Sequence, residues 1–335
     1  MRIAMLAPIS WRTPPRHYGP WEMVTSLLTE ALVARGVDVT LFATRDSRTA
    51  AKLDGVCPAP YSEDPTIDAK VWEILHIAHV FERAAEFDLI HNQADFMPLA
   101  FSRLVNVPLV TTIHGFSSER ILPAFKAYDD RVHYVAISQA DRHADLRYAA
   151  TIHHGVPLEE FPFKPQGNED LLFFGRIHPD KGAAEAIKAA HRSGRRLVMA
   201  GIVQDQNYHN EQVEPALGDG SAIYLGPVGG AARAKTLGSA RALLHLINFD
   251  EPFGLSVIEA LACGTPVIAC NRGSMPELID HGVTGFLVDS LDAAVAAIDR
   301  VGEIDRAACR AAVAARFTVD LMADRYLELY RSILG

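Results

Sequence analysis

The chain lacks several features that would place it in a common class of protein. Its 335 residues contain four cysteines, and their spacing matches no paired metal site, which favours buried, reduced thiols. No run of about 18 apolar residues occurs, so we expect no membrane-spanning helix. The apolar stretch at residues 1–9 carries one basic residue and is too short for a signal sequence. We therefore expect a cytoplasmic protein without a strong membrane anchor.

An excess of basic charge is also missing. The formal net charge is −9, and both halves of the chain are acidic, which argues against a nucleic-acid partner. No Gly-x-Gly-x-x-Gly motif follows an expected strand, so a nicotinamide-dependent oxidoreductase is disfavoured. Neither a short-period repeat nor a low-complexity segment is found.

Short apolar runs alternate with helical patterns along the chain, which is typical of parallel sheets covered by helices. The first series has expected strands at 2–7, 37–43, 87–91, 107–114 and 132–137, the last completing a sheet, and expected helices at 21–35, 72–85 and 97–104. Ser138 should cap a further helix. The second series has expected strands at 171–174, 196–200, 222–225, 242–247 and 267–269, and expected helices at 182–191, 292–298, 305–315 and 321–334. The fold class is therefore α/β, with two doubly wound domains.

The two series are joined by a Pro- and Gly-bearing connector at residues 153–162. A length of 335 residues with 49% hydrophobic residues also suits two domains better than one core. Ligands of doubly wound sheets bind beyond the carboxyl ends of the strands, so a cleft between the domains is the expected site. The pattern of the last helix does not show which domain it packs on.

Two carboxylates, Glu251 and Glu259, flank a Pro-Phe-Gly turn. The apolar run before this turn predicts a buried strand that ends at Glu251. Gly254 then frees the backbone where a helix over residues 255–263 should begin. The segment thus predicts a strand, a tight turn and a helix that together place the two carboxylates on either side of a helix start.

A helix start offers N–H groups without intrahelical partners, so those of Leu255 and Ser256 predict a seat for phosphate. Glu259 lies one turn further along, at about 6 Å along the helix axis. This is near the distance from a diphosphate to the hydroxyls of its ribose, and Glu251 would face the sugar end of the same ligand. One loop could therefore hold a nucleotide sugar at three points.

Each carboxylate also has an ordinary interpretation. A glutamate at a strand end is usually a solvated surface group, and one inside a helix usually faces solvent. Glu259, however, stands among apolar residues, where a carboxylate needs a partner that offsets its desolvation. This setting favours ligand binding.

Charged and polar residues follow two other expected strands. Arg176 and Lys181 lie in the loop Gly-Arg-Ile-His-Pro-Asp-Lys-Gly, where two fixed cations could neutralise a diphosphate without a metal ion. A solvated basic loop is the alternative. In the first series, His114 ends a strand in the motif Thr-Ile-His-Gly, and we expect it to be exposed to the same cleft. A lone histidine is more often a hydrogen-bonded structural residue.

Together these motifs resemble those of the retaining glycosyltransferases of family 4. The resemblance rests on the two glutamates with their Pro-Phe-Gly turn, on the cationic loop and Thr-Ile-His-Gly, and on the segments at 271–277 and 281–287. It covers essentially the whole chain and implies the GT-B fold, in which two Rossmann-like domains face a central cleft. The implied parts are an N-terminal acceptor-side domain (1–155), a C-terminal donor-binding domain (156–315) and a C-terminal helix that packs back on the first domain (316–335).

The resemblance also implies a role for each motif. The catalytic group would consist of Glu251, His114, Arg176 and Lys181. Glu251 would contact the donor sugar, and His114 its 6-hydroxyl, while the two cations would bind the diphosphate and stabilise the leaving group. Glu259 would bind the ribose. Further donor contacts would come from Gly19, Phe253, Gly254, Leu255 and Ser256, and the base pocket would draw on residues 201–204 and 226–229. No metal ion or cofactor is implied.

One loop departs from the family pattern. The family often has a Gly-Gly pair after its first strand, but here Gly19 is followed by Pro20, which has no N–H to offer a phosphate. The loop is also aromatic, with His17, Tyr18 and Trp21 close together. These rings predict a carbohydrate acceptor that stacks on them, with simple loop packing as the alternative.

The expected function is the transfer of a hexose from a nucleoside diphosphate sugar to an acceptor hydroxyl in carbohydrate biosynthesis. A UDP-sugar is the first expectation for the donor, and a carbohydrate or another small hydroxyl-bearing molecule for the acceptor. Retention of anomeric configuration and independence of metal ions are expected as well. A sugar-nucleotide epimerase or a phosphorylase of the same fold is the nearest alternative, and a non-catalytic carbohydrate-binding module is a more distant one.

Overall fold

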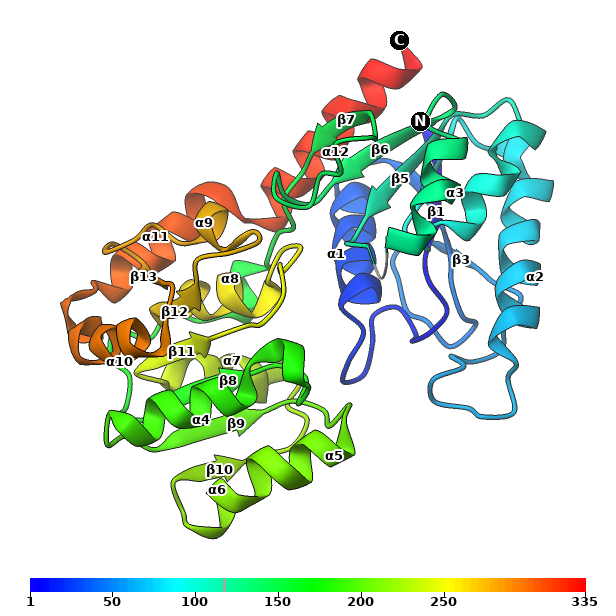
Figure 1. The fold of residues 1–335 in the computed structure, drawn as a ribbon. Helices are drawn as coiled ribbons and strands as arrows, with labels where there is room; N and C mark the ends of the chain where they lie inside the picture. The colour runs from blue at the N-terminus through cyan, green and yellow to red at the C-terminus, as the bar shows by residue number, and fades with distance from the viewer. Residues whose placement is uncertain (117–118) are drawn as a thin grey trace. The chain divides into compact units, whose positions relative to one another are not determined.

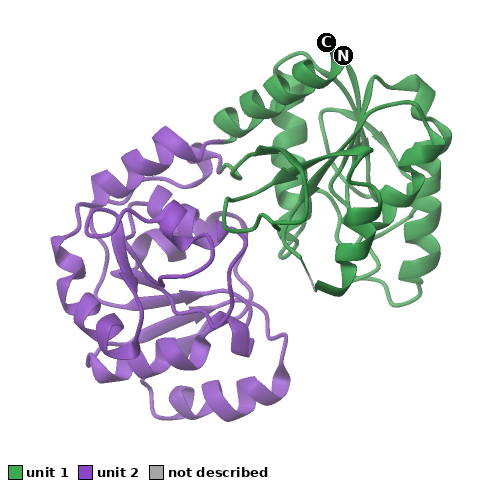
Figure 2. Ribbon diagram, turned by 45° about the horizontal axis from the view of Figure 1, so that its top comes forward, with its two compact units in different colours: residues 1–155, 319–335 green, residues 156–318 purple. Residues whose placement is uncertain are grey.

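The computed structural model describes residues 1–116 and 119–335, which form two compact units (Figures 1 and 2). Unit 1 comprises Met1–Gly155 and Val319–Gly335, and unit 2 comprises Val156–Thr318. The last helix, α12 (Val319–Leu334), therefore belongs with the N-terminal unit. Each unit contains one parallel sheet with helices, which confirms the predicted fold class. Within the described residues, no helix is long and apolar enough to cross a membrane.

Unit 1 is built on a seven-stranded sheet in the order β3-β2-β1-β4-β5-β6-β7. Its strands are β1 (Arg2–Leu6), β2 (Asp38–Phe42), β3 (Lys52–Asp54), β4 (Leu89–Asn92), β5 (Leu109–Ile113), β6 (Val132–Ala136) and β7 (Tyr148–Thr151). Its α-helices are α1 (Pro20–Ala34), α2 (Ala69–Glu82), α3 (Leu122–Ala127) and α12. From β1 the chain adds β2 and β3 on one side, and it then returns to place β4 on the other side of β1. Because the crossovers are right-handed, this reversal places α1 and α2 on opposite faces of the sheet (Figure 1).

The sequence patterns did not predict the two edge strands of this sheet. β3 and β7 are short and largely solvent-accessible, so neither carries the apolar run of a buried strand. The strand expected to complete the sheet is β6, and β7 pairs beyond it. The helix expected after Ser138 was also wrong. The Ser138 Oγ accepts a hydrogen bond from the Asp141 N–H at 3.0 Å, as a helix cap would, but the chain continues in turns as far as β7.

Unit 2 is built on a six-stranded sheet in the order β10-β9-β8-β11-β12-β13. Its strands are β8 (Leu171–Phe174), β9 (Leu197–Ala200), β10 (Ala222–Tyr224), β11 (Ala242–His245), β12 (Val267–Cys270) and β13 (Gly285–Val288). Its α-helices are α4 (Ala183–Arg192), α5 (Gln206–Tyr208), α6 (Glu214–Gly218), α7 (Gly230–Ser239), α8 (Leu255–Ala262), α9 (Met275–Leu278), α10 (Leu291–Arg300) and α11 (Arg306–Arg316). The predicted strands are present, whereas β13, α7, α9 and the segment from α5 to α6 were not predicted.

The direction of strand addition reverses between β8 and β11. From β8 the chain builds outward to β9 and β10, then returns and places β11 against the other side of β8, where Leu243 pairs with Leu172. The loops that leave two such strands diverge toward opposite faces and open a crevice at their carboxyl ends. The loop with Arg176 and Lys181 follows β8, and the segment with Glu251 follows β11. The topology therefore brings these two predicted site loops together within unit 2.

Gly182 permits the close approach of these loops. Its φ of 71° is left-handed, and a Cβ at this position would lie 1.8 Å from the carbonyl oxygen of Leu246. The neighbouring backbones are also bonded, because the Asn248 N–H donates to the Asp180 carbonyl at 2.7 Å. Any side chain at Gly182 would therefore force the two loops apart.

This contact predicts a difference between two glycines of similar conformation. Gly194 has a φ of 64°, and a Cβ at this position would meet nothing within 4 Å, so Gly194→Ala should cost only the left-handed strain of about 1 kcal/mol. Gly182→Ala adds a backbone clash and should cost at least about 3 kcal/mol. Calorimetry should therefore show the unfolding of unit 2 shifted by about 3 °C for Gly194→Ala and by about 10 °C for Gly182→Ala. Equal shifts would contradict the proposed contact.

Candidate functional site

A buried ion pair lies where the loops after β8 and β11 meet. The Lys181 Nζ is 2.5 Å from the Glu251 Oε2, and both side chains are largely buried. The His245 Nε2, at the end of β11, lies 3.5 Å from the same oxygen, at the outer limit of a hydrogen bond. Lys181 also sits over the ring of Phe249 at 4.6 Å. The Glu251 carboxylate is thus paired with a cation from one strand end, and a histidine at the end of the adjacent strand lies close to it.

These neighbours determine the ionisation of Glu251. Burial alone raises the pKa of a carboxyl group, but the interactions with His245 and Lys181 outweigh it and lower the pKa of Glu251 to about 2. The carboxylate therefore stays ionised at physiological pH. An ionised, desolvated carboxylate is able to accept hydrogen bonds from the hydroxyls of a sugar.

The turn after Glu251 is fixed by two glycines. Gly254 is the N-cap of α8 with a φ of 101°, and a Cβ there would lie 2.8 Å from the Met275 Cε. Gly273, in the loop after β12, approaches so closely that its Cβ would lie 2.5 Å from the Glu251 nitrogen. The Ser274 N–H donates to the Glu251 carbonyl at 3.0 Å. The loop after β12 therefore supports the backbone that carries Glu251.

The first turn of α8 follows directly. Leu255 and Ser256 are half-buried at its start, and Phe253 before them is buried with an edge-on contact to Phe317. The helix begins where the sequence predicted. Its first N–H groups have no partners within the helix, so they offer donors to an anion.

Glu259 is buried one turn further along α8, as its apolar neighbours in sequence required. Its desolvation is offset by a protein cation: Arg233, on α7, donates from Nε at 2.8 Å and from Nη2 at 2.5 Å to the Glu259 Oε2. Burial raises the pKa of Glu259, and the charge of Arg233 opposes this. The need for a counterion is thus met within unit 2, so apolar surroundings alone do not establish a ligand contact.

Arg176 contacts a different part of the loop cluster from Lys181. Its guanidinium donates to the Gln204 Oε1, at the end of the segment predicted to line the base pocket. That segment lies close by because Gly201 packs on the Gly175 carbonyl oxygen, where a Cβ would be 1.8 Å away. Residues 226–229 adjoin it, since the Gly201 N–H donates to the Gly226 carbonyl at 3.0 Å. The structure thus joins the loops after β8, β9 and β10.

In unit 1, His114 is buried rather than exposed as predicted. Its Nε2 lies 2.6 Å from the Gln93 Oε1, and its Nδ1 lies 3.3 Å from the His154 Nε2. The ring of Trp21 stacks on it at 5.2 Å. Burial, together with the nearby His91, lowers the pKa of His114 to about 3, so the imidazole is neutral. The structure therefore brings together Trp21 and His114, two of the predicted site residues.

The aromatic loop before α1 is only partly packed. His17 is exposed, whereas Tyr18 is half-buried with an edge-on contact to Trp11 at 6.0 Å. Gly19 is the N-cap of α1 with a φ of 144°, and Pro20 occupies the first helical position. Glu22 ties the loop to the helix, because its carboxylate accepts from the Trp11 N–H at 3.1 Å. Burial raises the pKa of Glu22 to about 7.

Sequence reasoning missed Arg233, His245, Gln93 and Glu22. Each acts through a tertiary contact with a residue far away in sequence or through burial, and none belongs to a motif. The one available signal was general: a buried carboxylate requires a counterion, which could have prompted a search for a cation near Glu259.

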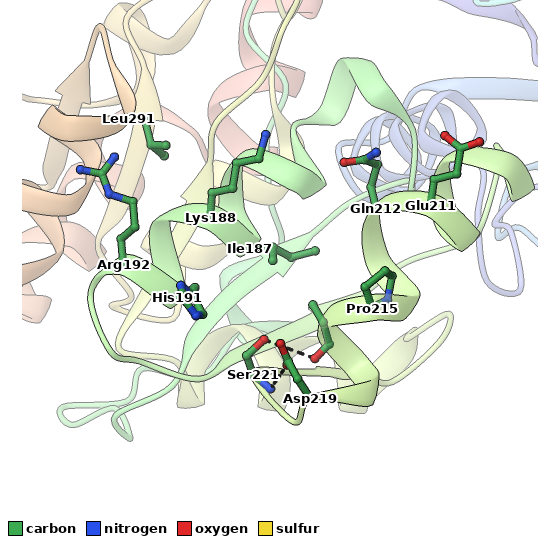
Figure 3. A pocket seen from close by; sticks show the side chains of 11 residues that line it. Ile187, Lys188, His191, Arg192, Glu211, Gln212, Pro215, Asp219, Ser221 and Leu291 are labelled. Carbon is green, nitrogen blue, oxygen red and sulfur yellow. Dashed lines mark hydrogen bonds between the residues drawn. The ribbon is translucent and has the colours of Figure 1, made fainter.

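A separate hollow, with a volume of about 400 Å³, lies on unit 2, and Figure 3 shows the side chains that line it. It is lined mainly by residues of α4 and of the segment from α5 to α6, among them His191 and Glu211, and also by Asp219, which follows α6. None of the predicted site residues lines it. The sequence therefore directs attention to the strand ends and not to this hollow.

The buried ion pair makes a testable contribution to stability. Since the pKa of Glu251 in the folded chain is below its ordinary value, its stabilising effect is full above about pH 4.5 and is lost as the pH falls toward 2. Lys181→Met removes the cation and should raise this pKa. A double-mutant cycle with Glu251→Gln, measured by urea unfolding, should give a coupling of about 3 kcal/mol near pH 7 and clearly less near pH 3.5. A coupling that does not change with pH would contradict the assignment.

Comparisons with known proteins identify the family of the chain. The family model described as Glycosyl transferases group 1 matches residues 158–316, and that described as Glycosyltransferase Family 4 matches residues 22–160. The glycogen synthase of Mycobacterium tuberculosis (strain CDC 1551 / Oshkosh) is 27% identical, over 94% of this chain and 89% of that protein. The D-inositol 3-phosphate glycosyltransferase of Arthrobacter sp. (strain FB24) is 27% identical, over 82% of this chain and 79% of that protein.

A solved structure shows the same fold. Anabaena HepE, crystallised in complex with UDP-glucose, superposes with a TM-score of 0.79 over 99% of this chain and 100% of that chain, at 20% identity. The two family matches lie end to end and span most of the sequence. The chain is a glycosyltransferase with the GT-B fold and belongs to glycosyltransferase family 4.

Proposed function

We propose that this glycosyltransferase moves a hexose from a nucleoside diphosphate sugar to an acceptor hydroxyl with retention of anomeric configuration. The observation that carries the proposal is the buried Lys181–Glu251 pair at the reversal of strand order in unit 2, with Glu259 one helical turn beyond. A cation, a helix start and two carboxylates are the groups that a diphosphate and two sugar rings require.

Unit 2 is proposed to hold the donor. Lys181 and Arg176 bind the diphosphate together with the backbone N–H groups from Phe253 to Ser256, and Glu259 binds the ribose. A diphosphate competes with Glu251 for the Lys181 ammonium. Donor binding therefore releases the Glu251 carboxylate to accept hydrogen bonds from the sugar.

UDP-hexoses are the first donors to test. Anabaena HepE, which shares the fold, binds UDP-glucose, and glycogen synthase is among the relatives. The acceptor is proposed to bind to unit 1, where Trp21 and the loop with His17 and Tyr18 offer aromatic faces to a carbohydrate. Gly19, at the start of α1, remains a proposed backbone contact to the donor.

The proposed reaction proceeds by attack on the same face as the departing group. The bond from the anomeric carbon to the diphosphate oxygen breaks as the bond to the acceptor oxygen forms. The departing phosphate oxygen takes the proton of the acceptor hydroxyl. The charge that develops on the diphosphate is stabilised by Lys181 and Arg176. An epimerase or phosphorylase is not favoured, because the named relatives are synthases and transferases of glycosyl groups.

The stereochemistry tests this proposal directly. The chain should hydrolyse one of the UDP-, GDP- or ADP-α-hexoses slowly in the absence of acceptor, and proton NMR of the first product should show the α anomer before mutarotation. Glu251→Gln should reduce this turnover by about 100-fold or more, since it removes a contact to the reacting sugar. A β-configured first product would contradict retention, and no turnover of any donor would contradict the donor assignment.

Metal independence is a second, separate expectation. Two side-chain cations near the diphosphate replace the charge that a divalent ion supplies in other transferases. Turnover should therefore change by less than about twofold when EDTA is added, because Lys181 and Arg176 remain in place. Activity that disappears in EDTA and returns with Mg²⁺ or Mn²⁺ would refute this.

A further inference from the structure

The contact between Arg233 and Glu259 is one-sided. Both donating nitrogens of Arg233 reach the same carboxylate oxygen, Oε2, at 2.8 and 2.5 Å. A guanidinium that pairs with a carboxylate in the usual fork would engage both oxygens. Here Oε1 of Glu259 accepts no hydrogen bond from Arg233. The Glu259 side chain has 9% of its surface exposed.

Arg233 is itself held in place from a second side. Its guanidinium lies over the ring of Phe174, the last residue of β8, at 5.1 Å. It projects from α7, which packs against α8, the helix that carries Glu259. A cation fixed between a strand end and a helix keeps its direction when a ligand arrives, because stacking and the ion pair both restrict it.

Among the charged groups around Glu259, Arg233 is its main counterion. Glu160, in the segment before the sheet of unit 2, disfavours the ionised form of Glu259. At the C-cap of α8, the thiol of Cys263 is neutral, since burial raises its pKa to about 11. On α11, Arg306 and Arg310 direct their hydrogen bonds to backbone carbonyls and to Thr265. Arg233 is therefore the cation that opposes the desolvation of Glu259.

We propose that Arg233 is a positioning residue for the donor nucleotide: it holds Oε2 of Glu259 and presents Oε1, ionised, to a ribose hydroxyl. This inference rests on the proposed function, because it takes Glu259 to meet the ribose. A hydrogen bond to an ionised acceptor is stronger than one to a neutral acceptor, so a fixed cation behind the carboxylate increases nucleotide affinity without touching the nucleotide.

The ionisation state supplies a signature that a purely structural role would lack. When Arg233 is replaced by methionine, only desolvation and Glu160 act on Glu259, and its pKa rises further. The carboxyl group then becomes protonated at a higher pH than in the wild type. As the pH falls, the affinity of the variant for the nucleotide should therefore decline before that of the wild type does.

The experiment measures the Kd of UDP by calorimetry for the full chain between about pH 6 and pH 8.5. The ratio of each variant's Kd to that of the wild type at the same pH cancels the titration of the UDP phosphate itself. For Arg233→Met this ratio should increase as the pH falls, to about tenfold at the acidic end of the range. For Arg233→Lys it should stay near one throughout. For Glu259→Gln it should show a loss that does not depend on pH.

Arg300 offers a matched control. It also pairs with a glutamate, Glu303, and also lies over a phenylalanine ring, that of Phe286, but it is on α10. Arg300→Met should leave the Kd of UDP unchanged at every pH. If Arg300→Met showed the same pH-dependent loss as Arg233→Met, the effect would not be specific to Glu259 and the inference would be wrong.

The remaining outcomes separate this inference from the proposed function. A wild type that binds UDP, together with an Arg233→Met ratio that is the same at every pH, overturns the role of Arg233 alone. If Arg233→Met does not fold, Arg233→Lys decides, because a lysine variant that binds as weakly as Glu259→Gln contradicts the role of the charge. A wild type that binds none of UDP, GDP and ADP overturns the proposed function, and this inference with it.

Discussion

The reversal of strand order between β8 and β11 is the constraint on which the site in unit 2 depends. It places the carboxyl ends of two buried, adjacent strands side by side, so that a lysine from one loop and a glutamate from the other meet at 2.5 Å. The backbones can approach only because Gly182 and Gly273 have no side chains in the contacts. Bringing charged groups into a partly buried crevice costs desolvation energy, which the ion pair offsets until a ligand competes for it.

The sequence predicted the parts of the fold that buried apolar runs dictate. Strands such as β8 and β11 are completely buried, and their uninterrupted apolar residues marked them clearly. Of the missed strands, β3 and β7 lie at sheet edges, where solvent-accessible residues carry no such pattern, whereas β13 is mostly buried but only four residues long and begins with a glycine. Helix α7 was missed for a related reason, since its Gly-, Ala- and Lys-containing sequence has few apolar residues with helical spacing.

The site could be predicted only as far as local rules reach. The strand-end rule located Lys181 and Glu251, and the glycine before α8 located the helix start. The partners of these residues come from elsewhere in the chain: Arg233 lies 26 positions before Glu259, and Gln93 lies 21 before His114. His114 is covered by Trp21 and His154, so its burial was not evident from the strand that carries it. Such contacts follow from tertiary packing and leave no pattern in the sequence.

The central claim is that unit 2 holds a nucleotide sugar at the reversal of strand order. A crystal structure of the chain with UDP tests it most directly. The account predicts the diphosphate within hydrogen-bonding distance of Lys181 and the first N–H groups of α8, with a ribose hydroxyl on the Glu259 Oε1. A nucleotide bound instead in the hollow lined by His191, Glu211 and Asp219, with the Lys181–Glu251 pair undisturbed, would contradict it.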